Sequence, residues 1–200
     1  RGWSYGGGLI DPRTGEIFKG YVNLGSQRVR QDLLIAEGIL APYKPGADPA
    51  LLTEAQQMAL QRLRQLAAHE VGHALGFAHN FAASRAATGS VLDYPHPQIS
   101  LGADGQPRMK IAYDTGVGEW DKFIVAHAYG VFTPAQEQAA LAKLRADIQA
   151  KGYSYVSDAD ARTLNSAHEA GLLWDVPGDP LLGLQQLLAV RQVALANFAA

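Results

Sequence analysis

The chain of 200 residues contains no cysteine, so no disulfide can stabilise its fold and no thiolate can bind a metal ion. It also lacks a basic excess: 17 lysines and arginines oppose 19 acidic residues, which argues against nucleic acid or an anionic membrane as the main partner. No apolar run predicts a membrane-spanning helix or a signal peptide. The chain does have 48% hydrophobic residues, enough to build a core in one domain or two small ones.

The chain also begins without a methionine, at Arg1. We therefore expect it to be a module of a longer protein, with any export signal or pro-region lying upstream. Neither composition nor charge predicts an oligomeric state.

A histidine-rich stretch from His69 to Asn80 reads His-Glu-Val-Gly-His-Ala-Leu-Gly-Phe-Ala-His-Asn. His69 and His73 are four residues apart, so on an α-helix they lie about 40° apart around the axis and one turn apart along it. Both imidazoles can then reach one ion. The spacing predicts a bidentate metal site on a helix.

Three further residues complete this predicted site. Glu70 points to the flank of the histidine pair, where it can hold a metal-bound water and act as a general base. Gly76 tolerates a positive φ, so the helix can end there and the chain can turn back to supply His79 as a third ligand. Three protein ligands leave one position of a tetrahedral Zn²⁺ open, whereas structural zinc sites are closed by four ligands that usually include thiolates. The stretch therefore predicts a catalytic zinc ion held by His69, His73 and His79.

The pattern His-Glu-x-x-His-x-x-Gly-x-x-His resembles the zinc signature of the metzincin metalloproteases. A second stretch, Ser90-Val-Leu-Asp-Tyr94, resembles the Met-turn of that clan, except that Leu92 stands in place of the methionine. The chain further resembles a bacterial group of zinc-dependent metzincin proteases through Asp11–Ile17, His79–Phe81 and Gly116–Lys122.

This resemblance implies roles for particular residues. Tyr94 matches a tyrosine that in some metzincins is a reversible zinc ligand or an oxyanion donor, so it joins Glu70 as a candidate catalytic residue; a buried structural tyrosine is the alternative. Leu92 matches the methionine that supports the zinc ligands from below, a role that requires volume and hydrophobicity. The substrate would pair with an exposed edge strand, for which Tyr5–Leu9 is the candidate, although this stretch could also be a flexible terminus. Export from a bacterial cell, to the periplasm or the exterior, is implied by the resemblance alone.

We expect an α+β fold of the metzincin type, with a small sheet and the active-site helix above a mainly helical lower part. The upper part would comprise residues 1–95 and the lower part residues 96–200, with a cleft between them. Two strands make a marginal sheet, so further strands could belong to sequence upstream.

Apolar periodicity and turn residues predict the individual elements. The upper part should hold a hairpin of Tyr5–Ile10 and Ile17–Leu24, a helix capped by Ser26 that runs through Ile39, and a long helix that starts at Asp48 or Thr53. It should end with a loop at Ala82–Ser90 that leads to the turn at Tyr94. The lower part should hold an irregular excursion at Ile99–Met109, with a hairpin around Asp104–Gly105 as one option, and helices at Glu119–Val131, Pro134–Ala150 (capped by Thr133), Asp158–Ala170 and Pro180–Phe198.

The other three histidines are assigned no metal role. His127 falls in a predicted helix and is expected to be packed and satisfied. His96 lies between two prolines and is expected in a surface turn. His168 is followed by a glutamate, but Leu172 stands where a second histidine would be needed.

The function predicted from the sequence is that of a zinc-dependent endopeptidase acting on peptide or protein substrates. One alternative is a metzincin-like module that keeps zinc and binds proteins but has lost turnover; the presence of Glu70 argues against it. A purely structural zinc domain is the other alternative, and the open set of three histidines argues against that.

Overall fold

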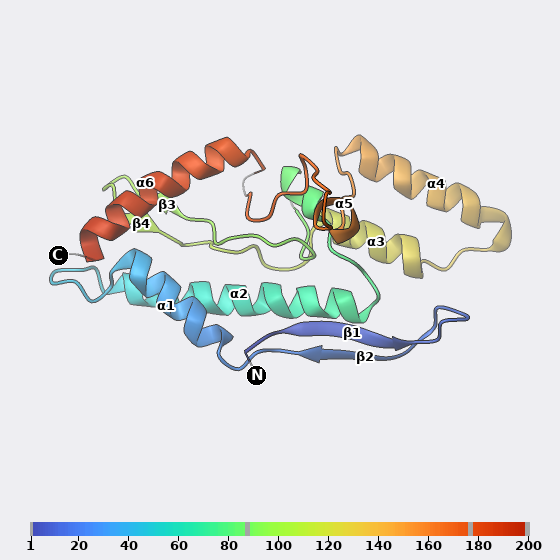
Figure 1. The fold of residues 1–200 in the computed structure, drawn as a ribbon, viewed down its shortest axis with the longest axis horizontal. Helices are drawn as coiled ribbons and strands as arrows, with labels where there is room; N and C mark the ends of the chain where they lie inside the picture. Colours follow the sequence, from blue (N-terminus) through green and yellow to red (C-terminus); the bar gives the residue numbers. More distant parts are fainter. Residues whose placement is uncertain (1, 87–88, 176–177, 199–200) are drawn as a thin grey trace.

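The computed structural model of the protein describes residues 2–86, 89–175 and 178–198. It combines helices with two small antiparallel sheets, arranged around one long helix, α2, so the expected α+β class is confirmed (Figure 1). The elements in chain order are β1 (Tyr5–Ile10), β2 (Ile17–Asn23), α1 (Arg28–Leu40), α2 (Ala50–Ala74), the 3-10 helix η1 (Phe81–Arg85), β3 (Ser100–Leu101), β4 (Pro107–Arg108), α3 (Glu119–Tyr129), α4 (Pro134–Ala150), α5 (Asp158–Ala161) and α6 (Pro180–Phe198).

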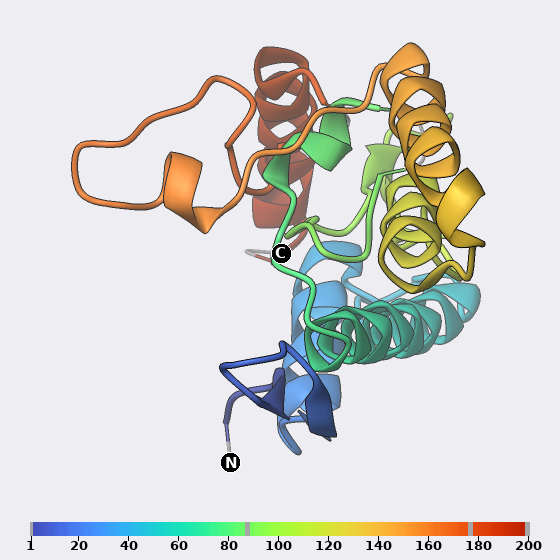
Figure 2. The ribbon, with the colours of Figure 1, turned by 90° about the vertical axis from the view of Figure 1, so that its right-hand side faces the viewer.

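The N-terminal hairpin forms as its two apolar runs predict. β1 and β2 pair antiparallel from Tyr5 opposite Asn23 to Ile10 opposite Ile17. Gly15 closes the turn with a φ of +76°, a conformation that glycine adopts without steric cost. Figure 2 shows α2 nearly end-on, with this hairpin on one side of the helix and the C-terminal half on the other.

Glycine lets the hairpin lie directly on the active-site helix. A Cβ atom on Gly6 would lie 2.0 Å from the backbone oxygen of Glu70, and one on Gly20 would lie 3.2 Å from that of Ala74. A side chain at Gly6 would therefore force β1 away from α2. A glycine within a strand often marks such a close approach of another backbone, and Gly6 of β1 is an example.

The first half of α2 packs against α1 and against the irregular segment that contains the second hairpin. The shared core consists of apolar side chains from all three segments: Ala36, Leu40, Leu51, Ala55, Met58, Met109, Ala112 and Tyr113. Helix α1 runs through Ile39 as predicted, and α2 begins between the two predicted starts, Asp48 and Thr53. The predicted cap of α1 is wrong. Ser26 does not cap α1, because the first amide, of Arg28, donates instead to the backbone oxygen of Gly25 in a turn.

The C-terminal half wraps over the face of α2 opposite the first hairpin. The optional hairpin around Asp104–Gly105 forms as β3 and β4, and α6 packs on it and on α1 (Figure 1). Helices α3 and α4 pack against each other around Trp120, Ile148 and Tyr153. Helix α4 spans Pro134–Ala150 as predicted, with a proline at its first position and a left-handed glycine, Gly152, after its end. The predicted cap is not formed, because the hydroxyl of Thr133 donates to Oε1 of Gln136 and makes no cap hydrogen bond.

Two further predictions are wrong in part. Helix α5 spans only Asp158–Ala161 of the helix expected over Asp158–Ala170, because Asn165 adopts a φ of +68° and the polar residues around it form turns instead. The expected loop at Ala82–Ser90 includes most of the 3-10 helix η1, in which the amide of Ala82 donates to the side chain of Asn80. Residues 87–88 of that loop lie outside the described residues.

The division into parts at residues 1–95 and 96–200 stays a prediction. The apolar core described above contains residues from both parts, so they pack together as one body. Across residues 2–86, 89–175 and 178–198, no helix combines the length and the apolar character needed to cross a bilayer.

Candidate metal centre

The C-terminal end of α2 carries two of the three predicted ligands. His69 is buried and His73 half-buried, one helical turn apart. The helix ends at Ala74, and Gly76 follows with a φ of +88° that turns the chain back. This turn brings His79 in from the loop, as predicted.

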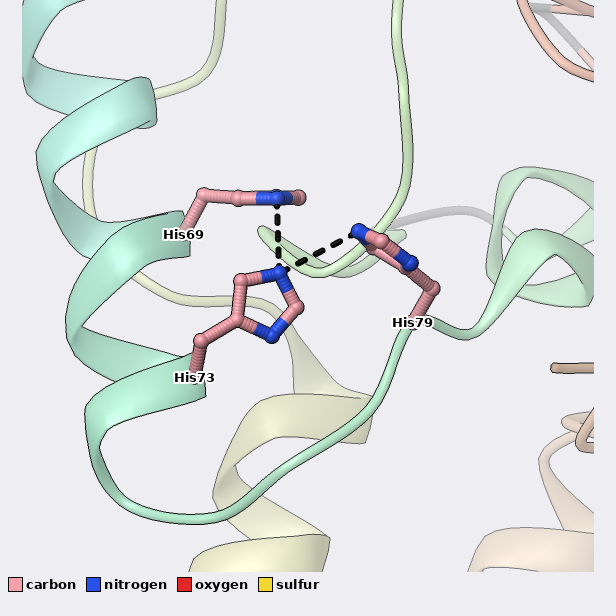
Figure 3. Close-up of side chains that lie close together, drawn as sticks. All are labelled: His69, His73 and His79. Atoms are coloured by element: carbon pink, nitrogen blue, oxygen red, sulfur yellow. Dashed lines mark hydrogen bonds between the residues drawn. The ribbon is translucent and has the colours of Figure 1, made fainter. Parts of the chain in front are cut away.

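The three imidazoles converge on one point (Figure 3). The Nε2 atom of His73 lies 3.0 Å from Nε2 of His69 and 3.2 Å from Nε2 of His79. Within the described part of the chain, this is the one group of three or more His, Cys, Asp or Glu residues whose ligand atoms all lie within 4.8 Å of one another.

The opposite nitrogen of each imidazole contacts an oxygen acceptor. Nδ1 of His69 lies 2.7 Å from the backbone oxygen of Val91, and Nδ1 of His73 lies 2.8 Å from that of Phe77. Nδ1 of His79 lies 2.5 Å from a carboxylate oxygen of Asp158. An oxygen acceptor at Nδ1 favours the tautomer that carries its proton there, which leaves the lone pair on Nε2.

This arrangement fits a divalent metal ion. Three Nε2 lone pairs directed at one another repel unless a cation lies between them. A tetrahedral zinc ion with Zn–N bonds of about 2.0–2.1 Å needs nitrogens about 3.3 Å apart, close to the spacing of the imidazoles. The donor set, three neutral imidazoles and no thiolate, is that of an open site with room for water or substrate.

Burial favours neutral, metal-ready imidazoles. It lowers the pKa of His69 to about 4, an effect that the hydrogen bond to Val91 only partly offsets. Burial also lowers the pKa of His79, against the opposing effect of Asp158. Since a histidine must lose its proton to bind a metal, both shifts favour the ligand form near neutral pH.

Glu70 lies beside this cluster with only 4% of its surface exposed. Burial raises the pKa of its carboxyl, whereas the neighbouring His73 and the backbone amide of Gly6 favour the ionised form. The residue directly after the first histidine is thus a desolvated carboxyl held between the helix and strand β1. A carboxyl of raised pKa is suited to exchange protons near neutral pH.

A family profile described as Met-zincin matches residues 52–200, which contain the whole site. The chain belongs to the Met-zincin family. Comparisons with curated proteins and with solved structures gave no match.

In this Met-zincin, Leu92 occupies the place beneath the histidines that the resemblance assigns to methionine. Its side chain is 1% exposed and packs on the helix between His69 and His73. A Cβ atom on Gly72 would lie 2.8 Å from Cδ2 of Leu92, so the helix backbone rests on the leucine. The position is filled by an apolar side chain of similar volume to methionine.

Tyr94 lies against the histidine cluster. Its ring stacks on that of His69 at a centroid distance of 5.4 Å and lies 4.6 Å from that of His79. Burial raises the pKa of its hydroxyl, and the nearby Asp158 adds to the rise. Tyr94 therefore stays protonated at neutral pH and is able to donate a hydrogen bond at the site.

Sequence reasoning missed the network that positions His69. The backbone oxygen of Val91 accepts from His69 and also from Nε2 of Gln65, which lies 3.1 Å away. The backbone amide of Val91 donates to the carboxylate of Asp121 at 2.9 Å. Asp121 also accepts from the hydroxyl of Ser90 and thereby ties α3 to the loop. The only indication of this role in the sequence is that Asp121 falls in Gly116–Lys122, a stretch that resembles the bacterial metzincin proteases.

The remaining histidines lie outside the cluster, as predicted. His127 is half-buried against the ring of Phe123, and its Nε2 accepts from Arg145. Nδ1 of His96 lies 2.7 Å from the backbone oxygen of Pro97. His168 accepts a hydrogen bond from the amide two residues later.

A surface cavity of about 1470 Å³ is lined in part by the loop that contains Tyr94. Its lining includes Val91 and Asp93 but none of the three clustered histidines and not Glu70. The chemistry of the site therefore lies outside this cavity.

Proposed function

We propose that this Met-zincin is a zinc-dependent endopeptidase, with His69, His73 and His79 as metal ligands and Glu70 as general base. The observation that carries the proposal is the convergence of three Nε2 atoms beside a buried carboxyl. A zinc ion held there supplies Lewis acidity, which polarises a peptide carbonyl and lowers the pKa of water towards about 7.

Glu70 would move the proton in this reaction. Its carboxylate takes a proton from the attacking water and delivers it to the amine of the departing peptide, so the residue ends each cycle as it began. Burial, which raises its pKa, makes it a stronger base than an exposed glutamate. The contact of Gly6 with Glu70 holds the helix and β1 together at this point.

Tyr94 would stabilise the oxyanion that forms as water adds to the carbonyl. Its ring packs between His69 and His79, and its raised pKa keeps the hydroxyl protonated as a donor. A donor that acts on the transition state alone raises the catalytic rate without tightening substrate binding. Tyr94→Phe should therefore lower kcat more than it changes KM, and an unchanged kcat would leave Tyr94 as a packing residue.

The test of the proposal is zinc content combined with cleavage of an unfolded protein substrate, with and without a chelator. Wild-type protein should bind about one zinc ion per chain and lose cleavage when the metal is removed. Glu70→Gln should keep zinc but lose cleavage by about 10²- to 10⁴-fold, since an amide cannot take the proton. Glu137→Gln, an exposed glutamate on α4, is the matched control and should cleave like wild type.

The same measurements distinguish the alternative function, a zinc-binding interaction module without turnover. Wild-type protein that binds zinc yet leaves every unfolded substrate intact would favour this alternative. Equal cleavage by wild type and Glu70→Gln would refute the assignment of the base. Export of the protein from a bacterial cell stays a prediction of the family resemblance.

A further inference from the structure

His79 is held differently from the other two histidines of the cluster. His69 and His73 belong to one helix, and their Nδ1 atoms face backbone oxygens. His79 belongs to the loop after the helix, and its Nδ1 faces the carboxylate of Asp158, a residue 79 positions later in the chain. Of the three contacts, only this one uses a side chain as its acceptor.

A buried asparagine brings Asp158 to this place. Asn80, the residue after the third histidine, is 0% exposed. Its side-chain oxygen accepts from the amide of Val156 at 3.0 Å, and its side-chain nitrogen donates to the backbone oxygen of Ser154 at 2.9 Å. The amide of Phe81 donates to the backbone oxygen of Val156 at 2.8 Å. The chain is thus tied beside His79 two residues before Asp158.

The surroundings of the carboxylate indicate what it contributes. The side chain of Asp158 is 50% exposed, and its second oxygen lies 3.8 Å from Nε of Arg162. Water and this arginine screen its charge, so electrostatic attraction alone contributes little. The direction of the contact is specific, however: it fixes the proton on Nδ1 and turns Nε2 of His79 towards the other two imidazoles.

We propose that Asp158 is a positioning residue for the metal site, which acts through His79 to set the orientation and tautomer of the one ligand that α2 does not carry. This inference rests on the proposed function in so far as the three histidines bind a metal. The segment around α5 thus has a role in metal binding that no local sequence motif predicts.

The test compares Asp158→Ala and Asp158→Asn with wild type and with Asp147→Ala, a control in which an exposed aspartate of α4 is removed. Zinc affinity is measured by competition with a chromogenic chelator. Asp158→Ala should bind zinc about 10- to 100-fold more weakly, the usual cost of losing such a partner of a ligand histidine. Asp158→Asn should fall between, because its amide oxygen can accept from Nδ1 but carries no charge. Asp147→Ala should match wild type.

Two further readouts separate positioning from general destabilisation. The visible absorption bands of the cobalt(II)-substituted protein report ligand geometry and should shift in Asp158→Ala. The melting temperature of the metal-free protein should stay unchanged in Asp158→Asn, so that weaker zinc binding by this variant cannot be attributed to unfolding. Unchanged zinc affinity and an unchanged cobalt spectrum in both Asp158 variants would overturn the inference while leaving the proposed function intact. A wild-type chain that bound neither metal would overturn the proposed function itself, and this inference with it.

Discussion

Two kinds of support meet at the histidine cluster. His69 and His73 are placed by one helix, whose repeat brings residues four apart onto the same face. His79 is placed by contacts between segments distant in sequence: Asn80 with Ser154 and Val156, and its own Nδ1 with Asp158. The helix-borne pair therefore depends on local geometry, whereas the loop-borne ligand depends on the packing of the C-terminal half.

Variants that affect the helix-borne ligands and variants that affect the loop-borne ligand should therefore differ in their effects on stability. Loss of the half-buried helix-borne ligand His73 should remove metal binding without disturbing the fold, because its side chain lies outside the apolar core. Loss of the buried Asn80 side chain, which ties the loop to Ser154 and Val156, should weaken metal binding and stability together. The following variants test that comparison.

The largest effect is expected from His73→Ala. This change removes one of the two ligands that α2 positions, and two remaining imidazoles form a poor zinc site. Protein purified without added metal should contain about one zinc ion per chain in wild type and close to none in the variant. His127→Ala, which removes a half-buried histidine outside the cluster, is the control and should keep its zinc. Full metal retention by His73→Ala would refute the ligand assignment.

Asn80→Ala should have the next largest effect, this time on stability. The change leaves the buried amides of Ala82 and Val156 without their side-chain acceptor. Each such unsatisfied group costs about 1–3 kcal/mol, so the free energy of unfolding should fall by about 2–6 kcal/mol.

Denaturant unfolding measures this loss, and chelator competition on the same samples should show weaker zinc binding. The control is Asn23→Ala, which removes a single hydrogen bond to the backbone oxygen of Trp3 near the chain terminus. A variant of Asn80 as stable as this control would contradict the role assigned to the hydrogen bonds of the Asn80 side chain.

A third prediction concerns Asp93, beside the loop tyrosine. Burial, together with the neighbouring Asp175, raises the pKa of Asp93 to about 7. The folded protein therefore holds this proton at pH values where the unfolded chain has released it. This contribution to stability is fully present below about pH 4 and is lost as the pH rises through about 7. For a single group the slope is at most about 1.4 kcal/mol per pH unit.

Asp175→Asn should flatten that dependence. Asp175 is 5% exposed, and among the described residues neither of its carboxylate oxygens has a hydrogen-bond partner. Removal of its charge should lower the pKa of Asp93 and diminish the loss of stability between about pH 5 and pH 8. Denaturant unfolding of the zinc-saturated protein across this range measures the effect, with Asp147→Asn as an exposed control. Identical slopes in the two variants would show that the buried pair is not coupled.

The smallest effect is expected from Leu92→Met, which restores the family's methionine beneath α2. Leucine and methionine have similar volume, and such exchanges in a core usually cost under about 1.5 kcal/mol. Zinc affinity and cleavage rate should each change by less than about tenfold, or about 1.4 kcal/mol. A gain of several orders of magnitude on restoring methionine would indicate a degenerate protease and favour the interaction module.

Local rules predicted most of the elements. The first hairpin follows from its two apolar runs and from Gly15, and the start and end of α4 follow from Pro134 and Gly152. Local rules failed where another backbone group or a turn was the better partner: at Ser26, and after Ala161, where Asn165 leaves the helical region. Both failures concern helix ends or short helices, in which local and tertiary contacts have similar energies.

The sequence by itself determined the identity and convergence of the three histidines, the position of Glu70 beside them and the turn at Gly76. These depend on the helical repeat and on one glycine, and both act over a few residues. Only the tertiary structure decided that Asp158 meets His79, that Asn80 ties the loop to Ser154 and Val156, and that Gly6 lies against Glu70. The physical reason is that these contacts join segments dozens of residues apart. Which of many polar side chains meets which is settled only when the apolar core brings those segments together.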